Sequence, residues 1–122
     1  AAGYVSEGSG ENLFAVVNSN GTVASAQSFR ATGSSKLGTG IYEVDFDRNV
    51  TNCVYQATIG DAGAVGVAPG EIGATGRLGN VNGVFVVTRN SSGTAVDQSF
   101  HFIVMCPPAP ASSQWTGTSR AP

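Results

Sequence analysis

IYEVDFD, at residues 41–47, alternates between apolar and acidic side chains from Tyr42 onward. Successive side chains of an extended chain point to opposite sides, so Tyr42, Val44 and Phe46 share one face and the carboxylates share the other. This period of two excludes a helix and predicts a strand with one buried face. We therefore predict that Tyr42, Val44 and Phe46 form part of the core.

The two cysteines lie in further strand patterns. CVYQATI, at residues 53–59, repeats the alternation with Cys53 on the apolar side. FHFIVMC, at residues 100–106, ends on Cys106 and is apolar on both faces, as is VFVVTR at residues 84–89. A strand that is apolar on both faces is covered on both. These two strands therefore lie centrally in a sandwich, or one of their faces meets another subunit.

Glycine- and asparagine-rich turn signals separate the strands. We expect hairpin turns at residues 18–21 and 90–93, because Asn and Gly tolerate positive φ. We also expect a loop at residues 34–40 and a long loop at residues 60–76 around one short strand. The result is an all-β chain of about seven to nine short antiparallel strands, typical of a single β-sandwich or jelly roll.

The chain length of 122 residues fits one domain. We assign residues 1–106 to the β-sandwich, and expect residues 1–11 either to be flexible or to cross from another element. Residues 107–122 are rich in Pro and Ser and form a C-terminal tail. This tail is either disordered or a peptide that docks Trp115, the only tryptophan, on its own domain or on a neighbour.

The charge of the chain argues against two classes of partner. Only 11% of residues are charged, the net charge is −2, and the six basic residues are scattered. Without a basic stripe we expect no binding to nucleic acid or anionic lipid. No apolar run approaches the ~20 residues that cross a bilayer, so no membrane insertion is expected. The small residues at positions 1–3 resemble a signal-peptidase site and suggest a mature secreted protein.

The two cysteines favour a disulfide over a metal site. Zinc needs about four ligands, and the chain offers two Cys and one His. A Cys53–Cys106 bond in a secreted or surface protein is expected, and the alternative is two buried thiols in a reducing compartment. The bond would close a loop of about 50 residues and contribute roughly 4 kcal/mol. We predict no metal and no cofactor.

Titratable groups give little evidence for an enzyme. His101, the only histidine, lies within a strand pattern and is expected to be structural or interfacial. Glu43, Asp45 and Asp47 recur at about 7 Å along one strand face. This row suits a calcium site, a glycosidase acid–base pair or, most simply, a solvated outer face. No aromatic residue alternates with these acids on their own face, and no hydrolase or nucleotide motif occurs, so we predict a non-enzymatic protein.

Candidate ligand-binding residues follow from residue type and position. Aromatic side chains can stack on sugar rings and polar side chains can bind hydroxyl groups, which points to Tyr4, Trp115, Glu71 and Arg77, the last two within the 60–80 region. Asn-x-Ser/Thr sequons begin at three asparagines in predicted turns, and whether they are glycosylated stays open: Asn20, Asn49 and Asn90.

A longer series of motifs resembles a secreted β-domain of actinobacterial type. In chain order these motifs are LFAVVNSNGT, GIYEVDFDRNVTNCVYQATIG, PGEI, NGVFVVTRNSSGT and FHFIVMC. The G-x-Y-x-V-x-F strand, the Y-x-A strand and the late NSSGT hairpin are similar to the tip domains of phage tail fibres, and more remotely to trimeric jelly rolls of the C1q type. The resemblance implies a trimer that contacts receptors or sugars and supplies no catalytic residues.

Three functions are open on the sequence alone. The leading hypothesis is a non-enzymatic extracellular module that assembles with itself, as a fibre, adhesion, cell-surface or virion-tip component. The alternative is a carbohydrate-binding, lectin-like domain that recognises a cell-surface glycan. The remote alternative is a hydrolase that uses Glu43, Asp45 or His101.

Overall fold

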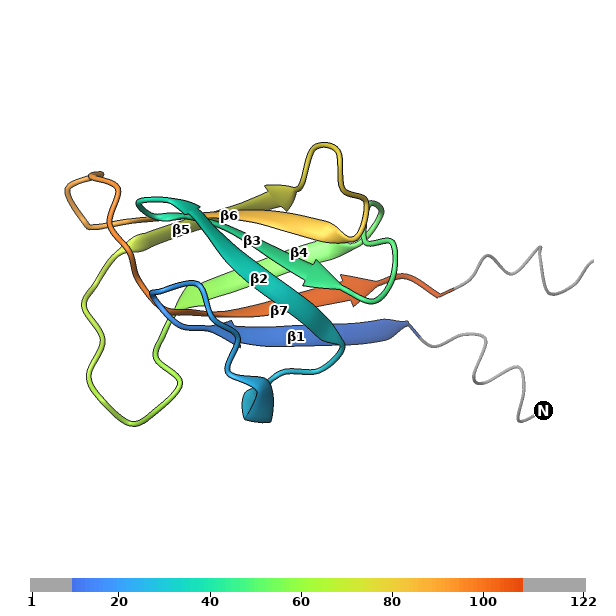
Figure 1. Cartoon of the computed structure of the whole chain (residues 1–122), viewed down its shortest axis with the longest axis horizontal. Coiled ribbons are helices and arrows are strands. Elements are labelled where there is room, and N and C mark those ends of the chain that lie inside the picture. The colour runs from blue at the N-terminus through green and yellow to red at the C-terminus, as the bar shows by residue number, and fades with distance from the viewer. Residues whose placement is uncertain (1–9, 109–122) are drawn as a thin grey trace, which may run out of the picture.

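Seven strands and one short 3₁₀ helix make up the computed structural model, which describes residues 10–108 (Figure 1). In chain order the elements are β1 (Glu11–Val17), η1 (Ser25–Gln27), β2 (Ala31–Gly38), β3 (Ile41–Phe46), β4 (Val54–Ile59), β5 (Glu71–Gly76), β6 (Gly83–Arg89) and β7 (Phe100–Cys106). Within residues 10–108, no helix is long and apolar enough to cross a membrane.

The strands form two antiparallel sheets that lie one over the other (Figure 1). Sheet A has the order β1-β7-β4, and sheet B has the order β2-β3-β6-β5. The predicted all-β sandwich with a Cys53–Cys106 disulfide is therefore confirmed. The first and last strands are neighbours, with Glu11 opposite Cys106, so both ends of the described chain leave from the same end of the sandwich.

Side chains from the inner faces of both sheets form the core. The predicted inner face of β3 is confirmed, since Tyr42, Val44 and Phe46 are at most 1% exposed. Two aromatic side chains of β7 meet them from the other sheet. The ring centroids of Tyr42 and Phe100 lie 5.2 Å apart, and those of Phe46 and Phe102 lie 6.2 Å apart. The alternation in the sequence thus identified the residues that fill the space between the sheets.

Strands β6 and β7 are apolar on both faces, and both occupy the middle of a sheet. β7 has β1 and β4 as neighbours, and β6 has β3 and β5. The prediction of a central position is confirmed for both strands. The outer side chains of β7 nevertheless remain accessible, with Ile103 42% and Met105 39% exposed. The segment at residues 60–61 packs against His101, so the exposed part of this outer face is the end that carries Ile103 and Met105.

Residues 34–40 do not form the predicted loop. Most of them belong to β2, which pairs with β3 from Ala31↔Phe46 to Gly38↔Ile41. Pairing with a strongly amphipathic strand outweighs the low strand propensity of Gly, Ser and Lys. Two register shifts, one near each end of β2, absorb the irregular sequence as bulges. Together with Lys36, these bulges make β2 a poor template for edge-to-edge pairing.

Both predicted hairpin turns form, but neither connects two fully paired strands. At the first turn the Asn18 N–H donates to the Thr22 carbonyl at 2.8 Å, and the residues that follow touch β1 through isolated bridges only. After the second turn the chain crosses from sheet B to sheet A. Turn chemistry is local, whereas the choice of partner strand depends on long-range packing of the apolar faces.

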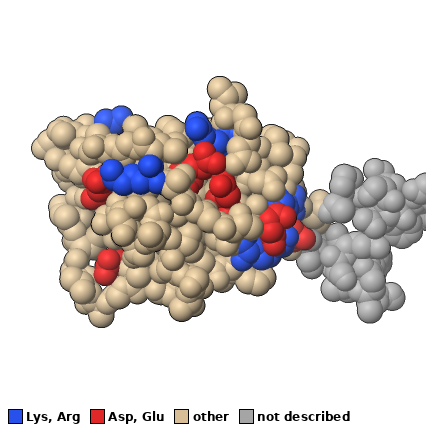
Figure 2. All heavy atoms as spheres, in the orientation of Figure 1, with Lys and Arg blue, Asp and Glu red and all other residues tan. Residues whose placement is uncertain are grey.

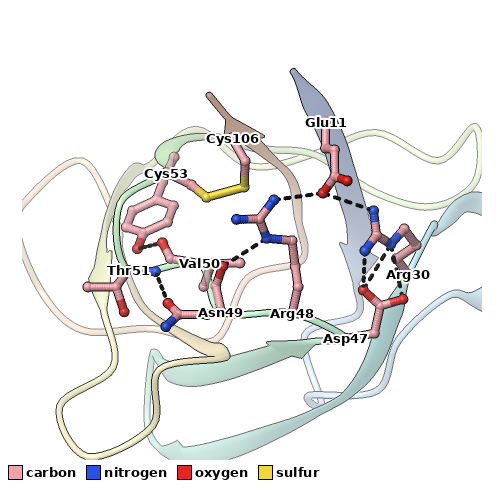
Figure 3. Close-up of a disulfide and its surroundings, with 10 residues drawn as sticks. Glu11, Arg30, Asp47, Arg48, Asn49, Val50, Thr51, Cys53 and Cys106 are labelled. Carbon is pink, nitrogen blue, oxygen red and sulfur yellow. Dashed lines mark hydrogen bonds and ion pairs between the residues drawn. A yellow bond between two sulfur atoms is a disulfide. The ribbon is translucent and has the colours of Figure 1, made fainter. Parts of the chain in front are cut away.

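The disulfide joins neighbouring strands of sheet A. Cys53 immediately precedes β4 and Cys106 ends β7, with the two Cα atoms 4.3 Å apart. Figure 3 shows the bond beside the start of β1, at the end of the sandwich from which both chain ends leave. The bond therefore links the end of β7 to the start of β4, at the end of sheet A where β1 also begins.

A chain of ion pairs next to the disulfide connects the two sheets (Figure 3). Glu11 on β1 contacts Arg48 at 2.7 Å and Arg30 at 3.3 Å, and Arg30 contacts Asp47 at 2.8 Å. The hydrogen bond from Arg48 lowers the pKa of Glu11, and the one from Arg30 lowers the pKa of Asp47. Arg30 adopts a φ of 65°, which is uncommon for a residue with a side chain. From this conformation its side chain reaches both Glu11 and Asp47.

Candidate functional site

Two carboxylates of the β3 row meet two side chains of the β5–β6 loop on the outer face of sheet B. The Arg77 Nε–H donates to Glu43 Oε1 at 2.6 Å. The Asn80 Nδ2 donates to Glu43 Oε2 at 2.8 Å and to Asp45 Oδ1 at 2.9 Å. Both amide hydrogens of Asn80 are thus used, and the loop is tied to β3. We call Glu43, Asp45, Arg77 and Asn80 the carboxylate cluster.

The third acid of the predicted row is separate from this cluster. Asp47 lies beyond the end of β3 and belongs to the ion pairs beside the disulfide. Asp47 fits the expectation of a solvated outer face, because its side chain is 42% exposed. Glu43 does not fit it, because its side chain is only 15% exposed. Figure 2 shows acidic and basic side chains next to one another in small groups on this face. In the described part of the chain, no group of three His, Cys, Asp or Glu residues could hold a metal ion.

An aromatic side chain lies beside the carboxylate cluster, contrary to what the β3 sequence suggests. Phe85 on β6 is the cross-strand partner of Glu43, so the two side chains share the outer face. The Arg77 guanidinium carbon lies 5.7 Å from the centroid of the Phe85 ring, a cation–π distance. Arg77 is therefore held by the ring and by Glu43 together. The pairing of β3 with β6 assembles these groups, which spacing along one strand could not reveal.

Gly83 leaves the room that the carboxylate cluster needs. It lies opposite Asp45 in the pairing of β3 with β6. A Cβ atom at this position would be 2.8 Å from Asp45 Oδ1 and 2.8 Å from Asn80 Nδ2. Both separations are shorter than van der Waals contact, so any other residue here would displace the carboxylate or the amide.

The two carboxyl groups of the cluster have shifted pKa values, in opposite directions. Burial and the neighbouring Glu43 raise the pKa of Asp45 to about 6. A hydrogen bond from the Asp45 carboxyl, with those from Asn80 and Arg77, lowers the pKa of Glu43. Between these two pKa values the pair holds one proton, on Asp45, and one negative charge, which balances Arg77.

Replacing Asp45 with asparagine should stabilise the protein at neutral pH but not in acid. The pKa of Asp45 is raised from 3.8 to about 6 on folding, so the folded state binds the proton more tightly. Its ionisation therefore destabilises the fold as pH rises through this window, and the penalty is complete above it. We expect Asp45→Asn to raise the free energy of unfolding by about 1–2 kcal/mol at about pH 7.5 and to change it little near pH 4, measured by urea unfolding.

Asp47→Asn is the matched control for this experiment. Because Arg30 lowers the pKa of Asp47, its carboxylate stabilises the fold above the unfolded-state pKa, and this contribution disappears as pH falls. The control should therefore be less stable than the wild type at about pH 7.5. A stability gain in both variants would show that removing any negative charge, and not the Asp45–Glu43 pair, is responsible.

A groove adjoins the carboxylate cluster, between the β5–β6 loop and the residues around the start of β4. Its volume is about 630 Å³, and its lining includes Thr51, Tyr55, Thr75, Gly76, Arg77 and Leu78. Asn80 also lines it. Two members of the carboxylate cluster thus form part of its wall, and the carboxylates fix their positions. We call this feature the β5–β6 groove.

The only histidine makes a structural contact. His101 Nε2 lies 2.9 Å from the carbonyl oxygen of Asp61, and a Cβ on Gly60 would lie 2.8 Å from the ring. The imidazole is thus packed against the start of the 60–70 segment. His101 faces outward from sheet A, whereas Glu43 and Asp45 face outward from sheet B. His101 and the two acids, which the hydrolase hypothesis named as alternatives, therefore lie on opposite sides of the sandwich.

Two of the predicted ligand-binding residues, Arg77 and Glu71, lie in the described part of the chain and line separate depressions. Arg77 lines the β5–β6 groove. Glu71 is exposed on β5, opposite Arg89, and lines a separate depression of about 210 Å³. Tyr4 and Trp115 lie outside the described residues. The residues that sequence reasoning missed are Phe85 and Gly83, which the register of β6 identifies, and Asn80, which the β5–β6 loop brings to the two acids.

The sequon asparagines occupy turns, as predicted. In each turn the side-chain oxygen of the asparagine accepts a hydrogen bond from the backbone N–H two residues later. The three asparagines are Asn20, Asn49 and Asn90.

The outer face of sheet A carries exposed apolar side chains. Phe14 on β1 lies opposite Ile103 on β7, and Met105 on β7 lies opposite Val54 on β4. Phe29, from the segment that bridges β1, stacks on Phe14 with the ring centroids 5.6 Å apart. These five residues are between 39% and 61% exposed. We call them the apolar face.

No protein-family model, curated protein or solved structure matches the chain. Its function therefore has to follow from the carboxylate cluster, the β5–β6 groove and the apolar face.

Proposed function

We propose that this protein is a non-enzymatic extracellular module that assembles with itself, and that a second copy binds to the apolar face. The observation that carries the proposal is the exposed outer side of β7, the central strand of sheet A. Contiguous exposed apolar residues with polar surroundings mark interaction sites on globular proteins. Burial of the two aromatic and three aliphatic side chains of this face would supply the driving force for association.

The composition of this face favours a second copy as the partner. Contact between two copies of this face would bring no like charges together. A charged partner, in contrast, would have no oppositely charged side chain with which to form an ion pair. None of the nine outward positions of sheet A holds an Asp, Glu, Lys or Arg: Asn12, Phe14, Val16, Val54, Gln56, Thr58, His101, Ile103 and Met105.

Association through the faces fits the sandwich better than association through the β1 or β2 edge. The β1 edge is partly covered by the segment that carries Phe29. The β2 edge has two bulges and a lysine, which discourage strand addition. Packing of sheet A against sheet A of another copy is therefore the arrangement that we propose.

Two observations support the extracellular and non-enzymatic parts of the proposal. The disulfide suits a compartment outside the reducing cell interior. Both Glu43 oxygens accept hydrogen bonds from Arg77 and Asn80, and a general acid–base pair would need free groups in reach of one substrate. A trimeric fibre, cell-surface or virion-tip component is the form that the resemblance to tail-fibre tips and C1q-type jelly rolls implies.

Ile103→Lys should convert the assembled protein to monomers. The new ammonium group would have to lose its hydration in the interface, and neighbouring copies would bring like charges together. We expect association at least about tenfold weaker than in the wild type, measured by sedimentation equilibrium over a range of protein concentrations.

Leu37→Lys is the matched control for the Ile103 substitution. Leu37 is 44% exposed and Ile103 is 42% exposed, and Leu37 lies in β2 of the other sheet. The control should associate like the wild type. Wild-type protein that remains monomeric at millimolar concentration would refute self-assembly. Equal weakening by the two lysines would refute the assignment of the interface to sheet A.

A further inference from the structure

We propose that the β5–β6 groove binds a neutral, hydroxyl-rich ligand, a saccharide. None of the five residues of the apolar face lines the groove, so this proposal does not rest on self-association. Its volume of about 630 Å³ is in the range of sites that hold small organic ligands.

The wall of the groove is already ordered. Arg77 is held by Glu43 at 2.6 Å, by the ring of Phe85 and by a backbone hydrogen bond from its N–H to Gly83 at 3.0 Å. Asn80 is held by the two carboxylates, and its side-chain oxygen accepts the N–H of Asn82 at 3.1 Å. A ligand therefore binds without the loss of side-chain freedom that weakens association with a flexible surface.

The charge balance of the groove selects against ions. Arg77 is the charged residue in its lining, and Glu43, directly behind it, carries the compensating charge. Asp45 adds a second carboxylate behind Asn80 at neutral pH. With both acids ionised, Glu43, Asp45 and Arg77 sum to one net negative charge (two negative and one positive), which disfavours an anionic ligand, and the exposed Arg77 disfavours a cationic one. A neutral ligand meets neither barrier.

Unused hydrogen-bonding groups and apolar side chains alternate along the groove. The side-chain hydroxyls of Thr51 and Thr75 and the Nη atoms of Arg77 make no hydrogen bond within residues 10–108. Next to them, Leu78 is 92% exposed and Val81 is 57% exposed. Hydroxyl groups can pair with the first set, and the C–H surface of a sugar ring can cover the second. A ligand with both properties on one ring is a saccharide.

The first test uses neutral and charged saccharides as probes. Cellobiose, maltose and N,N′-diacetylchitobiose would be titrated into uniformly ¹⁵N-labelled full chain, with digalacturonate as the anionic comparison. We expect at least one neutral disaccharide to shift the amide signals of Thr51, Gly76 and Gly79 with a dissociation constant on the order of millimolar. Absence of shifts with all three neutral sugars, or tighter binding of digalacturonate, would overturn the proposal.

Gly76→Val and Gly73→Val form the decisive pair of variants. A Cβ on Gly76 points toward the Tyr55 hydroxyl at 3.4 Å inside the groove, whereas a Cβ on Gly73, on the same strand, meets Val87 at 3.6 Å outside it. We expect Gly76→Val to weaken binding by at least about tenfold and Gly73→Val to leave it unchanged. Equal effects of the two variants would refute binding in the groove.

Leu78→Ser keeps the test decisive if Gly76→Val does not fold. Leu78 is almost fully exposed, so its loss removes no core packing. We expect this variant to bind the neutral disaccharide about two- to tenfold more weakly than the wild type, because the sugar loses an apolar contact. Unchanged affinity would count against the groove. Sedimentation of each variant separates this result from self-association, because neither residue lies on the apolar face.

Discussion

Unfolding of the Cys53→Ala, Cys106→Ala double variant should require about 4 kcal/mol less free energy than unfolding of the wild type. The disulfide spans a sequence separation of 53 residues, so its loss frees a long loop in the unfolded chain. The slope of the free energy against urea concentration should also rise, because the unfolded chain without the cross-link exposes more surface. Urea unfolding in the absence of reductant measures both quantities.

Reduced wild-type protein is the control for this variant. It keeps both sulfur atoms, so it separates the loss of the cross-link from the small cavity left by alanine at Cys106, which is 4% exposed. The reduced protein and the double variant should agree within about 1 kcal/mol. Overlapping unfolding curves for reduced and oxidised wild type would show that the bond does not stabilise the fold.

Gly40→Ala should lower the free energy of unfolding by about 3–4 kcal/mol. Gly40 lies between β2 and β3 with a φ of 66°. An added Cβ would lie 2.5 Å from the carbonyl oxygen of Thr88 and 2.9 Å from that of Val96. The substitution therefore adds backbone strain and also pushes the β2–β3 turn away from β6, where the Gly40 carbonyl accepts the Thr88 N–H at 2.8 Å. Thermal and urea unfolding both report this loss.

Gly79→Ala isolates the strain from the clash. Gly79 has a φ of 86°, but an added Cβ there would meet no atom within 4 Å. Its replacement should lower the free energy of unfolding by about 1 kcal/mol, the cost of the left-handed conformation alone. Similar losses at the two positions would mean that the close approach of Gly40 to the Thr88 carbonyl is not important for stability.

The alternation of apolar and polar residues predicted those strands that have a buried face. Tyr42, Val44 and Phe46 recur at every second position, and each is buried. The same reasoning placed Cys106 on the inner side of the last strand, where it meets Cys53. Strong amphipathic strands carry their own burial pattern, so these parts of the fold are visible in the sequence.

The sequence could not predict β2 or the pairing of the strands. The ATGSSKLG sequence of β2 has weak strand propensity, and β3 supplies the partner that makes it a strand. Turn signals at residues 18–21 suggested that β1 continues into a hairpin, but β1 pairs with β7 from the other end of the chain. Propensity is local, whereas pairing depends on contacts between residues far apart in sequence.

The candidate site was only partly visible for the same reason. Glu43 and Asp45 were evident as a carboxylate row, and Arg77 was a candidate ligand-binding residue. Their relation depends on the register that sets Phe85 opposite Glu43 and on the loop that brings Asn80 to both acids. A single strand pattern contains neither piece of information.

The nearness of Glu11 to Cys106 determines how the domain would respond to a pulling force on its two ends. Tension at residues 10 and 108 would open the β1–β7 ladder from one end, pair by pair. The load would then run along the backbone to Cys53 and cross the sulfur bridge to Cys106, so the chain between the cysteines would bear none of it. At ~3.5 Å per residue, the extensible part from residue 10 to Cys53 would lengthen to about 150 Å and no further. The bridge would thus act as a mechanical stop.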